Sequence, residues 1–188
     1  MRIIAGKFRG RKLKSPPSLE TRPTSDRLRE TLFNIIAPRI EGARFLDLCA
    51  GSGAVGIEAI SRGAAEVTFV DSSRKMGQLI DANLDLCRVQ KDQAQVLIAK
   101  AAEFLRRRLK RPEEPWSLIY FDPPYEEDYL PTLQLFGRNA NELLDRDGLL
   151  IVEHHHKNDL SDLVGSLRRF RVVKQGESAL SFYERAKV

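Results

Sequence analysis

The sequence Phe45-Leu46-Asp47-Leu48-Cys49-Ala50-Gly51-Ser52-Gly53 indicates a buried strand that runs into a glycine turn. A helix is expected to follow over residues 54–62, and Gly63 is positioned to end it. The glycines allow a tight turn and let a ligand approach the backbone closely. Ligands bind open α/β sheets at the carboxyl ends of strands, so this unit predicts a binding loop at such an end.

The same alternation of strand and helix continues to the end of the chain. Because repeated strand–helix units place helices on both faces of a parallel sheet, the pattern predicts a doubly wound α/β fold. The last two strands, joined by a turn at 175–178, would form an antiparallel hairpin and bring the mostly parallel, Rossmann-like sheet to seven strands. The expected strands cover residues 45–49, 67–70, 96–98, 116–121, 149–152, 170–174 and 179–184, and the expected helices cover 54–62, 73–87, 101–110, 128–144 and 159–166.

A basic segment precedes this α/β pattern. Residues 1–30 contain nine lysines and arginines but only three acids, an excess of six positive charges, whereas the whole chain carries +5. This segregation predicts a surface that grips nucleic acid through its phosphates, and the alternative is a solvated basic arm that packs on the domain. The residues expected to contact RNA are Lys7, Phe8, Arg9, Arg11, Lys12, Arg22, Thr24 and Arg29.

We expect this segment to fold as a small β-hairpin followed by a helix. The short strands would cover 2–5 and 11–13, and Thr24 or Ser25 can cap a helix that extends to about Ala37. The chain would then have two parts, an N-terminal appendage over 1–38 and a larger domain over 39–188.

A second acid, Asp71, ends the next expected strand, twenty residues beyond Gly51. At that place a carboxylate can accept hydrogen bonds from ribose hydroxyls. Residues 51–56 also spell the dinucleotide fingerprint G-x-G-x-x-G, which keeps a nicotinamide-dependent oxidoreductase as an alternative. Asp47 argues against that alternative, because a dinucleotide-binding strand is normally apolar there and an acid suits a ligand with an ammonium group.

The tetrapeptide Asp122-Pro123-Pro124-Tyr125 follows the expected strand 116–121. Proline fixes φ and donates no backbone hydrogen bond, so the strand must stop and the turn is stiff. The Asp122 carboxylate and the Pro123 carbonyl can then face one point as acceptors, with the Tyr125 ring beside them. Two acceptors and a ring suit a planar base that carries an exocyclic amino group. The alternatives are an ordinary strand-to-loop turn and a non-catalytic RNA-binding protein.

The composition argues against several other classes of protein. Hydrophobic residues make up 42% and charged residues 30%, as in a soluble globular protein, and no apolar run is long enough to span a membrane. Cys49 and Cys87 lack the spacing of metal ligands, so we expect reduced thiols in the cytoplasm and no metal. We interpret His154-His155-His156 as the polar end of a strand near the site.

Taken together, these motifs resemble a known enzyme family. The stretch 47–53 resembles motif I of class I S-adenosylmethionine-dependent methyltransferases, and Asp71 resembles their ribose-binding acid. The stretch 122–125 resembles the catalytic motif of members that methylate amino groups. The resemblance covers nearly the whole chain. Three further stretches narrow it to the RsmD family, namely 6–13, 22–34 and 179–183.

The resemblance implies a cofactor, a partner and a set of site residues. The RsmD family methylates guanine N2 at position 966 of 16S rRNA. S-adenosylmethionine is therefore the implied cofactor, and the implied partner is 16S rRNA, free or in an assembling small subunit. We expect the enzyme to be a monomer. DNA adenine N6-methyltransferases use related motifs and are the nearest alternative. The catalytic residues would be Asp122, Pro123, Pro124 and Tyr125, and the cofactor would contact Asp47, Cys49, Ala50, Gly51, Ser52, Gly53, Asp71, Ser72, Lys100, Ala101 and Asp122.

One position departs from the family pattern. Such enzymes usually carry Asp or Asn before the helix expected at 101–110, where the side chain accepts from the adenine amino group, and this chain has Lys100. A lysine cannot accept a hydrogen bond. Adenine would therefore be read by the Ala101 backbone or by a shifted neighbour.

Overall fold

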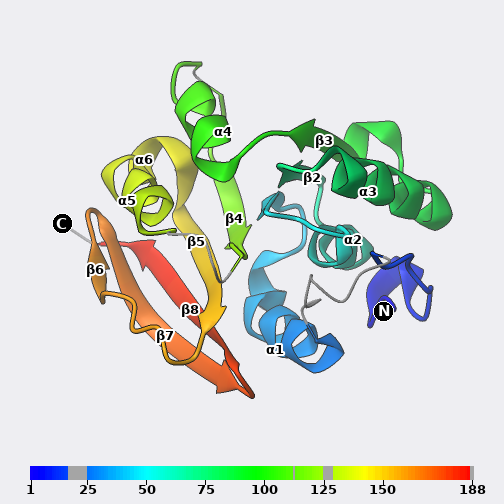
Figure 1. Cartoon of the computed structure of the whole chain (residues 1–188), viewed down its shortest axis with the longest axis horizontal. Coiled ribbons are helices and arrows are strands. Elements are labelled where there is room, and N and C mark those ends of the chain that lie inside the picture. Colours follow the sequence, from blue (N-terminus) through cyan, green and yellow to red (C-terminus); the bar gives the residue numbers. More distant parts are fainter. Residues whose placement is uncertain (17–24, 112, 125–128, 187–188) are drawn as a thin grey trace.

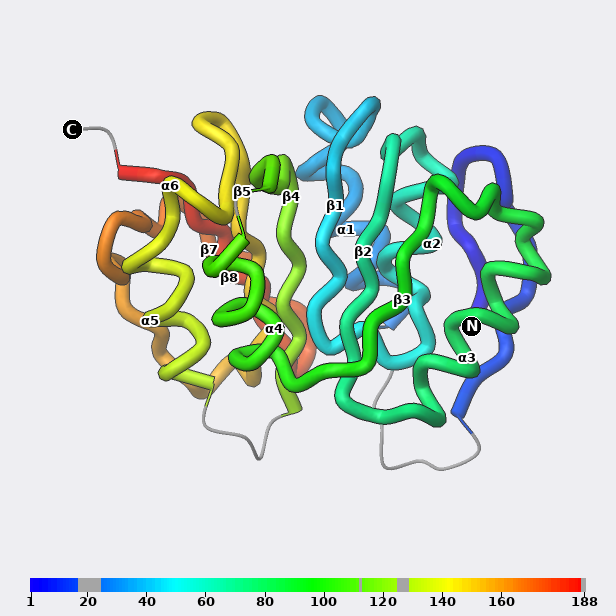
Figure 2. The backbone as a smooth tube through the Cα atoms, turned by 90° about the horizontal axis from the view of Figure 1, so that it is seen from above, coloured from blue at the N-terminus to red at the C-terminus, as the bar shows by residue number. Residues whose placement is uncertain are grey.

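The structure is a computed structural model that describes residues 1–16, 25–111, 113–124 and 129–186 (Figure 1). An eight-stranded sheet with the order β3-β2-β1-β4-β5-β8-β7-β6 forms its centre (Figures 1 and 2). The first five strands in this order are parallel, and β8, β7 and β6 run antiparallel to their neighbours, which confirms the predicted doubly wound, mostly parallel sheet. The strands are β1 (Arg44–Leu48), β2 (Glu66–Asp71), β3 (Ala94–Ile98), β4 (Trp116–Phe121), β5 (Leu144–His155), β6 (Leu163–Val164), β7 (Leu167–Gln175) and β8 (Ser178–Arg185).

The helices divide between the two faces of the sheet. Apolar side chains of α1, α2 and α3 form one buried cluster with sheet residues such as Phe45 and Phe69. Those of α4, α5 and α6 form a second cluster with Leu46 and Ile119. Successive strand residues thus point to opposite faces, and both faces are buried, as is usual in parallel sheets. Among the described residues, no helix has the length and hydropathy needed to cross a membrane. The helices are α1 (Asp26–Ile36), α2 (Ala54–Ser61), α3 (Arg74–Cys87), α4 (Ala101–Arg108), α5 (Leu130–Arg138) and α6 (Ala140–Leu143), with short 3-10 turns η2 (Ala37–Arg39) and η3 (Lys91–Gln93).

The helix predicted over 159–166 is wrong. Residues 163–164 form β6 instead, which pairs antiparallel with the start of β7. Gly165 lies in the turn between them with φ of +56°, a conformation that glycine favours and an α-helix excludes. The sheet therefore has eight strands rather than the predicted seven. The helix predicted over 128–144 is divided into α5 and α6 at Asn139, whose φ of −127° is not helical.

The N-terminal segment, which is residues 1–16 of the described chain, folds back on itself, but the two strands predicted for it are wrong. A single antiparallel bridge joins Arg2 to Lys12 across the turn η1 (Gly6–Phe8). Regular strands do not continue from this bridge, because the N–H groups of Ile4 and Ala5 donate to the Glu58 side chain at 2.7 and 3.0 Å. Of the predicted hairpin, the structure confirms only that the chain reverses direction between Arg2 and Lys12.

This N-terminal segment shares the core of the larger domain. Ile3, Phe8 and Leu13 are buried in the cluster that α1 and α2 form on the sheet. The following helix, α1, begins as predicted, because the Ser25 side chain caps it by accepting from Leu28 N–H at 3.1 Å. The division of the chain at residue 38 stays a prediction.

Candidate active site

Three strand ends meet at the carboxyl edge of the sheet, where the strand order reverses between β1 and β4. The loop after β1 is bound to the end of β2, because the N–H groups of Cys49 and Ala50 donate to the Val70 carbonyl at 2.9 and 3.0 Å. The end of β4 is bound to β1, since Asp122 N–H donates to the Leu48 carbonyl at 3.2 Å. The predicted cofactor loop and the predicted catalytic motif are therefore neighbours at the place where doubly wound sheets bind ligands.

The loop between β1 and α2 has an unusual backbone. Cys49, Gly51 and Gly53 all have positive φ, of 68°, 55° and 76°. This conformation suits glycine and costs energy in a residue with a Cβ, so Cys49 is a strained position of the kind that gathers at functional sites. A Cβ at Gly51 would meet nothing within 4 Å, which leaves the backbone there open to a ligand. A Cβ at Gly53 would meet the Ile80 side chain at 3.2 Å, so this glycine also lets the loop pack on α3.

Asp71 fixes this loop from the end of β2. One carboxylate oxygen accepts from Gly51 N–H at 2.9 Å, and the other accepts from Ser73 N–H at 2.8 Å. Asp71 is half-buried beside the exposed Ser72, and each carboxylate oxygen has a second lone pair. The position fits a ribose, whose hydroxyls are donors, lying next to the open Gly51 backbone.

Asp47 lies beneath the loop, buried in β1. Its carboxylate accepts from the Gly56 N–H of α2 at 2.8 Å. Burial raises the pKa of Asp47 to about 7, against the lowering effect of the Gly56 hydrogen bond and with a smaller contribution from the charge of Asp71. A nearby ammonium would favour the ionised form of this carboxyl group. A contact between Asp47 and the ammonium group of a ligand stays a prediction.

The raised pKa predicts a pH-dependent stability. An acid whose pKa rises on folding stabilises the protein fully below its unfolded pKa, here near 3.8, and the contribution is lost as pH rises through about 7. Across this range the free energy of unfolding should fall more steeply in wild type than in Asp47→Asn, by up to about 1.4 kcal/mol for each pH unit. Chemical denaturation of both proteins at several pH values measures the two slopes, and parallel slopes would contradict the assigned pKa.

The predicted catalytic motif is described as far as Pro124. Asp122 is half-buried, Pro123 is buried and Pro124 is exposed, so the chain turns outward from the sheet as the two prolines predict. Tyr125 lies outside the described residues, and its role stays a prediction.

The end of β3 brings Lys100 and Ala101 to the same edge. Ala99 N–H donates to the Asp71 carbonyl at 2.9 Å, which holds the start of α4 beside the cofactor loop. The Lys100 side chain is exposed, and Ala101 is half-buried. Recognition of adenine through the Ala101 backbone stays a prediction.

A polar cluster occupies the end of β5, next to the end of β4. Glu153 is buried and accepts from the Tyr120 hydroxyl and, at 3.0 Å, from the Ser178 hydroxyl. His154 is also buried, with Nε2 at 2.8 Å from Ser181 Oγ. The histidine run is thus the polar end of a strand, as predicted. In the part of the chain that the structure describes, no cluster of His, Cys, Asp and Glu has the arrangement of a metal site.

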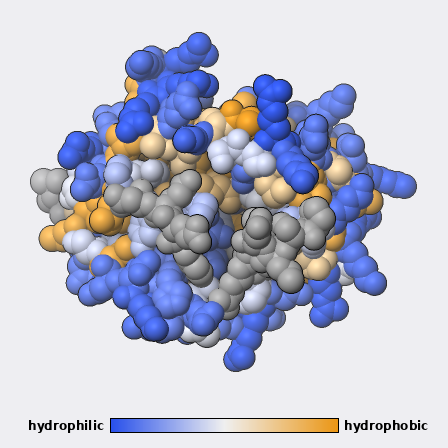
Figure 3. Space-filling view, viewed as in Figure 1, coloured by the Kyte–Doolittle hydropathy of each residue, from blue (hydrophilic) through white to orange (hydrophobic). Residues whose placement is uncertain are grey.

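Some of the predicted RNA contacts have exposed side chains on the N-terminal segment. These residues are Lys7, Arg9, Arg11 and Lys12. On the face seen in Figure 3, hydrophilic residues lie around most of the rim, and apolar residues lie closer to the middle. Two further candidates, Arg22 and Thr24, lie outside the described residues.

The structure corrects two of the predicted RNA contacts. Phe8 is 4% exposed and packs in the main core, so its ring is not available to a base. Arg29 is 0% exposed, and its guanidinium donates to the Arg2 carbonyl at 2.6 Å and to Asp26 at 2.9 Å. Arg29 precedes the buried Phe33 by four residues, which places both on the inward side of α1.

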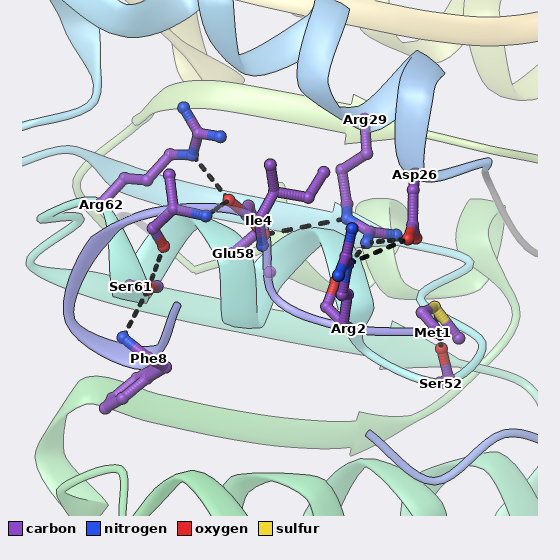
Figure 4. Close-up of polar contacts among 12 residues, drawn as sticks. Met1, Arg2, Ile4, Phe8, Asp26, Arg29, Ser52, Glu58, Ser61 and Arg62 are labelled. Carbon is purple, nitrogen blue, oxygen red and sulfur yellow. Dashed lines mark hydrogen bonds and ion pairs between the residues drawn. The ribbon is translucent and has the colours of Figure 1, made fainter. Parts of the chain in front are cut away.

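Glu58 was not predicted, yet its carboxylate joins the N-terminal segment to α2 (Figure 4). This buried side chain accepts from Ile4 and Ala5, as described above, and from Arg62 Nε at 2.7 Å, and it forms an ion pair with Arg29 at 3.9 Å. A signal for this role is present in the sequence. Glu58 is the one acid of α2, whose other residues are apolar or small, and a buried charge needs partners.

Comparison with known proteins agrees with the fold and the site. The family described as "Conserved hypothetical protein 95" matches residues 1–184. The "Ribosomal RNA small subunit methyltransferase D" of Escherichia coli is 37% identical over 186 residues, which cover 98% of this chain and 90% of that protein. The chain belongs to the RsmD family.

A second relative of this RsmD-family chain is the "Putative rRNA methyltransferase YlbH" of Bacillus subtilis, 38% identical over 185 residues that cover 98% of this chain and 99% of that protein. A solved structure described as "Putative methyltransferase yhhF from Escherichia coli" is 37% identical. The match covers 99% of this chain and 98% of that chain, with a TM-score of 0.84. The expected Rossmann-like methyltransferase fold is therefore confirmed over the whole length of the chain.

Proposed function

We propose that this protein is an S-adenosylmethionine-dependent rRNA methyltransferase that transfers a methyl group to the exocyclic N2 of a guanine in 16S rRNA. The observation that carries the proposal is the junction of the loop 49–53 with Asp71 and Asp122 at one edge of the sheet. Membership of the RsmD family supports it, since a full-length relative is named for small-subunit rRNA methylation.

The residues of the cofactor loop fit S-adenosylmethionine. The open Gly51 backbone can lie against the ligand, Asp71 can accept from ribose hydroxyls, and Asp47 offers a buried acid to the ammonium end. When bound, the cofactor supplies an activated methyl group on a sulfonium. The protein would hold that methyl group in one orientation, and the loop 49–53, which is fixed by hydrogen bonds to Val70 and Asp71, is suited to this role.

The end of β4 would hold the base. The lone pair of a guanine N2 is delocalised into the ring, which makes the amine a poor nucleophile. The Asp122 carboxylate and the Pro123 carbonyl would accept hydrogen bonds from its two N–H groups and favour a more pyramidal nitrogen. As the nitrogen bonds to the methyl carbon, the bond from carbon to sulfur breaks to leave S-adenosylhomocysteine, and the proton that the nitrogen loses would pass to Asp122 or to water. Tyr125 would stack on the base, which has to be splayed out of its helix or loop to reach the site.

The exposed bases of the N-terminal segment would bind the RNA backbone. Phosphate contacts release counterions, so the affinity for 16S rRNA would fall as the salt concentration rises. Such contacts position the RNA, whereas the choice of guanine falls to the groups at the end of β4.

Mass mapping of methylated nucleosides tests the reaction. The purified protein is incubated with methyl-labelled S-adenosylmethionine and either unmodified 16S rRNA or duplex DNA. Label in N2-methylguanosine from the rRNA would support the proposal. Label in N6-methyladenine from the DNA would favour the alternative enzyme, and binding of NADH without transfer to either substrate would favour an oxidoreductase.

Removal of the Asp71 carboxylate should weaken cofactor binding. Asp71→Ala removes an acceptor for the ribose and also frees Gly51 N–H, so we expect a loss of about 1–3 kcal/mol in the binding free energy of S-adenosylhomocysteine. Titration calorimetry measures the change. Asp81→Ala, at an exposed position of α3, is the matched control and should bind like wild type. Unchanged affinity in Asp71→Ala would remove Asp71 from the cofactor site.

A further inference from the structure

Asn83, a fully buried residue of α3, joins the cofactor loop to the N-terminal segment. Its Nδ2 donates to the Ser52 carbonyl at 2.9 Å and to the Lys14 carbonyl at 3.1 Å. Its Oδ1 accepts from Lys14 N–H at 2.8 Å. Both donors and the acceptor of this one amide are engaged, so its loss breaks the contacts to both partners together.

Ser52 is the point at which the two segments meet. It lies between Gly51 and Gly53, so its carbonyl belongs to the positive-φ turn that would carry the cofactor. Met1 Sδ lies 3.7 Å from Ser52 Oγ, and the Met1 carbonyl accepts from Leu13 N–H at 3.1 Å. Met1 therefore contacts the cofactor loop directly, and Lys14 is joined to the loop through Asn83.

Basic side chains extend from the same backbone that Asn83 holds. Lys12 and Lys14 are exposed, and Lys14 gives both its N–H and its carbonyl to the Asn83 amide. Lys14 can thus present its ammonium group to an RNA phosphate while its backbone is bound, through one side chain, to the carbonyl of Ser52.

We propose that Asn83 is a positioning residue through which the binding of RNA and the binding of cofactor strengthen each other. The proposal rests on the proposed function, because it requires both ligands. An RNA that holds the N-terminal segment also holds the Ser52 carbonyl, so the loop loses less conformational freedom when cofactor binds. By thermodynamic linkage, the cofactor raises the affinity for RNA by the same factor.

The test is a binding cycle with S-adenosylhomocysteine and in vitro transcribed 16S rRNA. The dissociation constant of S-adenosylhomocysteine is measured with and without saturating rRNA, in wild type and in Asn83→Ala. We expect rRNA to raise the affinity about fivefold or more in wild type and less than about twofold in the variant. Asn139→Ala is the matched control, since Asn139 Nδ2 donates to the Leu135 carbonyl at 2.8 Å in α5, and it should keep the wild-type factor.

A second measurement does not depend on the folding of any variant. In wild type, rRNA alone should slow amide hydrogen exchange in the loop 50–53 as well as in residues 1–14. Protection confined to 1–14 would overturn the proposal, as would equal factors in wild type and Asn83→Ala. A wild type that binds each ligand with no coupling would overturn it while leaving the proposed function intact. A wild type that binds neither ligand would refute both.

Discussion

Alanine in place of Asp122 should slow methyl transfer by about a hundredfold or more, the usual effect of losing a polar contact made in the transition state. The carboxylate would strengthen its contact as the guanine nitrogen pyramidalises, and such a contact lowers the chemical barrier rather than only improving binding. The backbone should stay in place, since Asp122 N–H donates to the Leu48 carbonyl at 3.2 Å and alanine keeps this group. Single-turnover transfer with saturating rRNA and cofactor measures the chemical step.

Two further variants make this result specific. Asp122→Asn should be milder, because its side-chain carbonyl still accepts a hydrogen bond. Asp147→Ala removes an exposed acid from the amino-terminal part of β5, at the opposite edge of the sheet, and should turn over like wild type. Binding of S-adenosylhomocysteine should change little in all three, because the loop 49–53 and Asp71, rather than Asp122, are expected to make most of the contacts with the cofactor. Wild-type turnover in Asp122→Ala would show that the Asp-Pro-Pro-Tyr stretch is a structural turn.

The features of the site that follow from the sequence are those with a local cause. The turn after β1 needs positive φ at Gly51 and Gly53, and glycine supplies it. Asp71 and Asp122 end or follow strands of a parallel sheet, whose carboxyl ends share one edge. The alternation of strands and helices in the sequence therefore predicts that the cofactor loop and both acids lie at one edge of the sheet. It does not predict their hydrogen-bond partners.

The features that the sequence does not predict depend on contacts between distant segments. Asn83 binds Lys14 across 69 residues, and Glu58 binds Ile4 across 54 residues. No spacing pattern in the sequence predicts either contact. Phe8 illustrates the same limit. An aromatic ring among basic residues predicts a nucleic-acid contact, and the sequence does not show that Phe8 is buried in the same core cluster as residues of α2. The sequence predicts a basic hairpin appended to the domain, and the structure places Ile3, Phe8 and Leu13 of this segment in the core.

Removal of the Glu58 carboxylate should cause the largest loss of stability that we predict. Glu58→Ala should lower the free energy of unfolding by about 3–5 kcal/mol, the usual result of removing one partner of a buried ion pair. The variant leaves the Arg29 guanidinium buried opposite a cavity, and it removes the acceptor for the N–H groups of Ile4 and Ala5 (Figure 4). Urea denaturation followed by circular dichroism measures the change.

A second substitution separates the effect of the Glu58 charge on stability from the effect of its hydrogen bonds. Glu58→Gln keeps an oxygen that can accept from Ile4 or Ala5 but not the charge opposite Arg29, so its loss should be intermediate. Glu103→Ala removes an acid that pairs with Arg107 on the exposed side of α4, and such surface pairs contribute about 1 kcal/mol or less. If Glu58→Ala were no more destabilised than Glu103→Ala, the buried carboxylate would not be what fastens the N-terminal segment to α2. The anchoring would then rest on the apolar contacts of Ile3, Phe8 and Leu13.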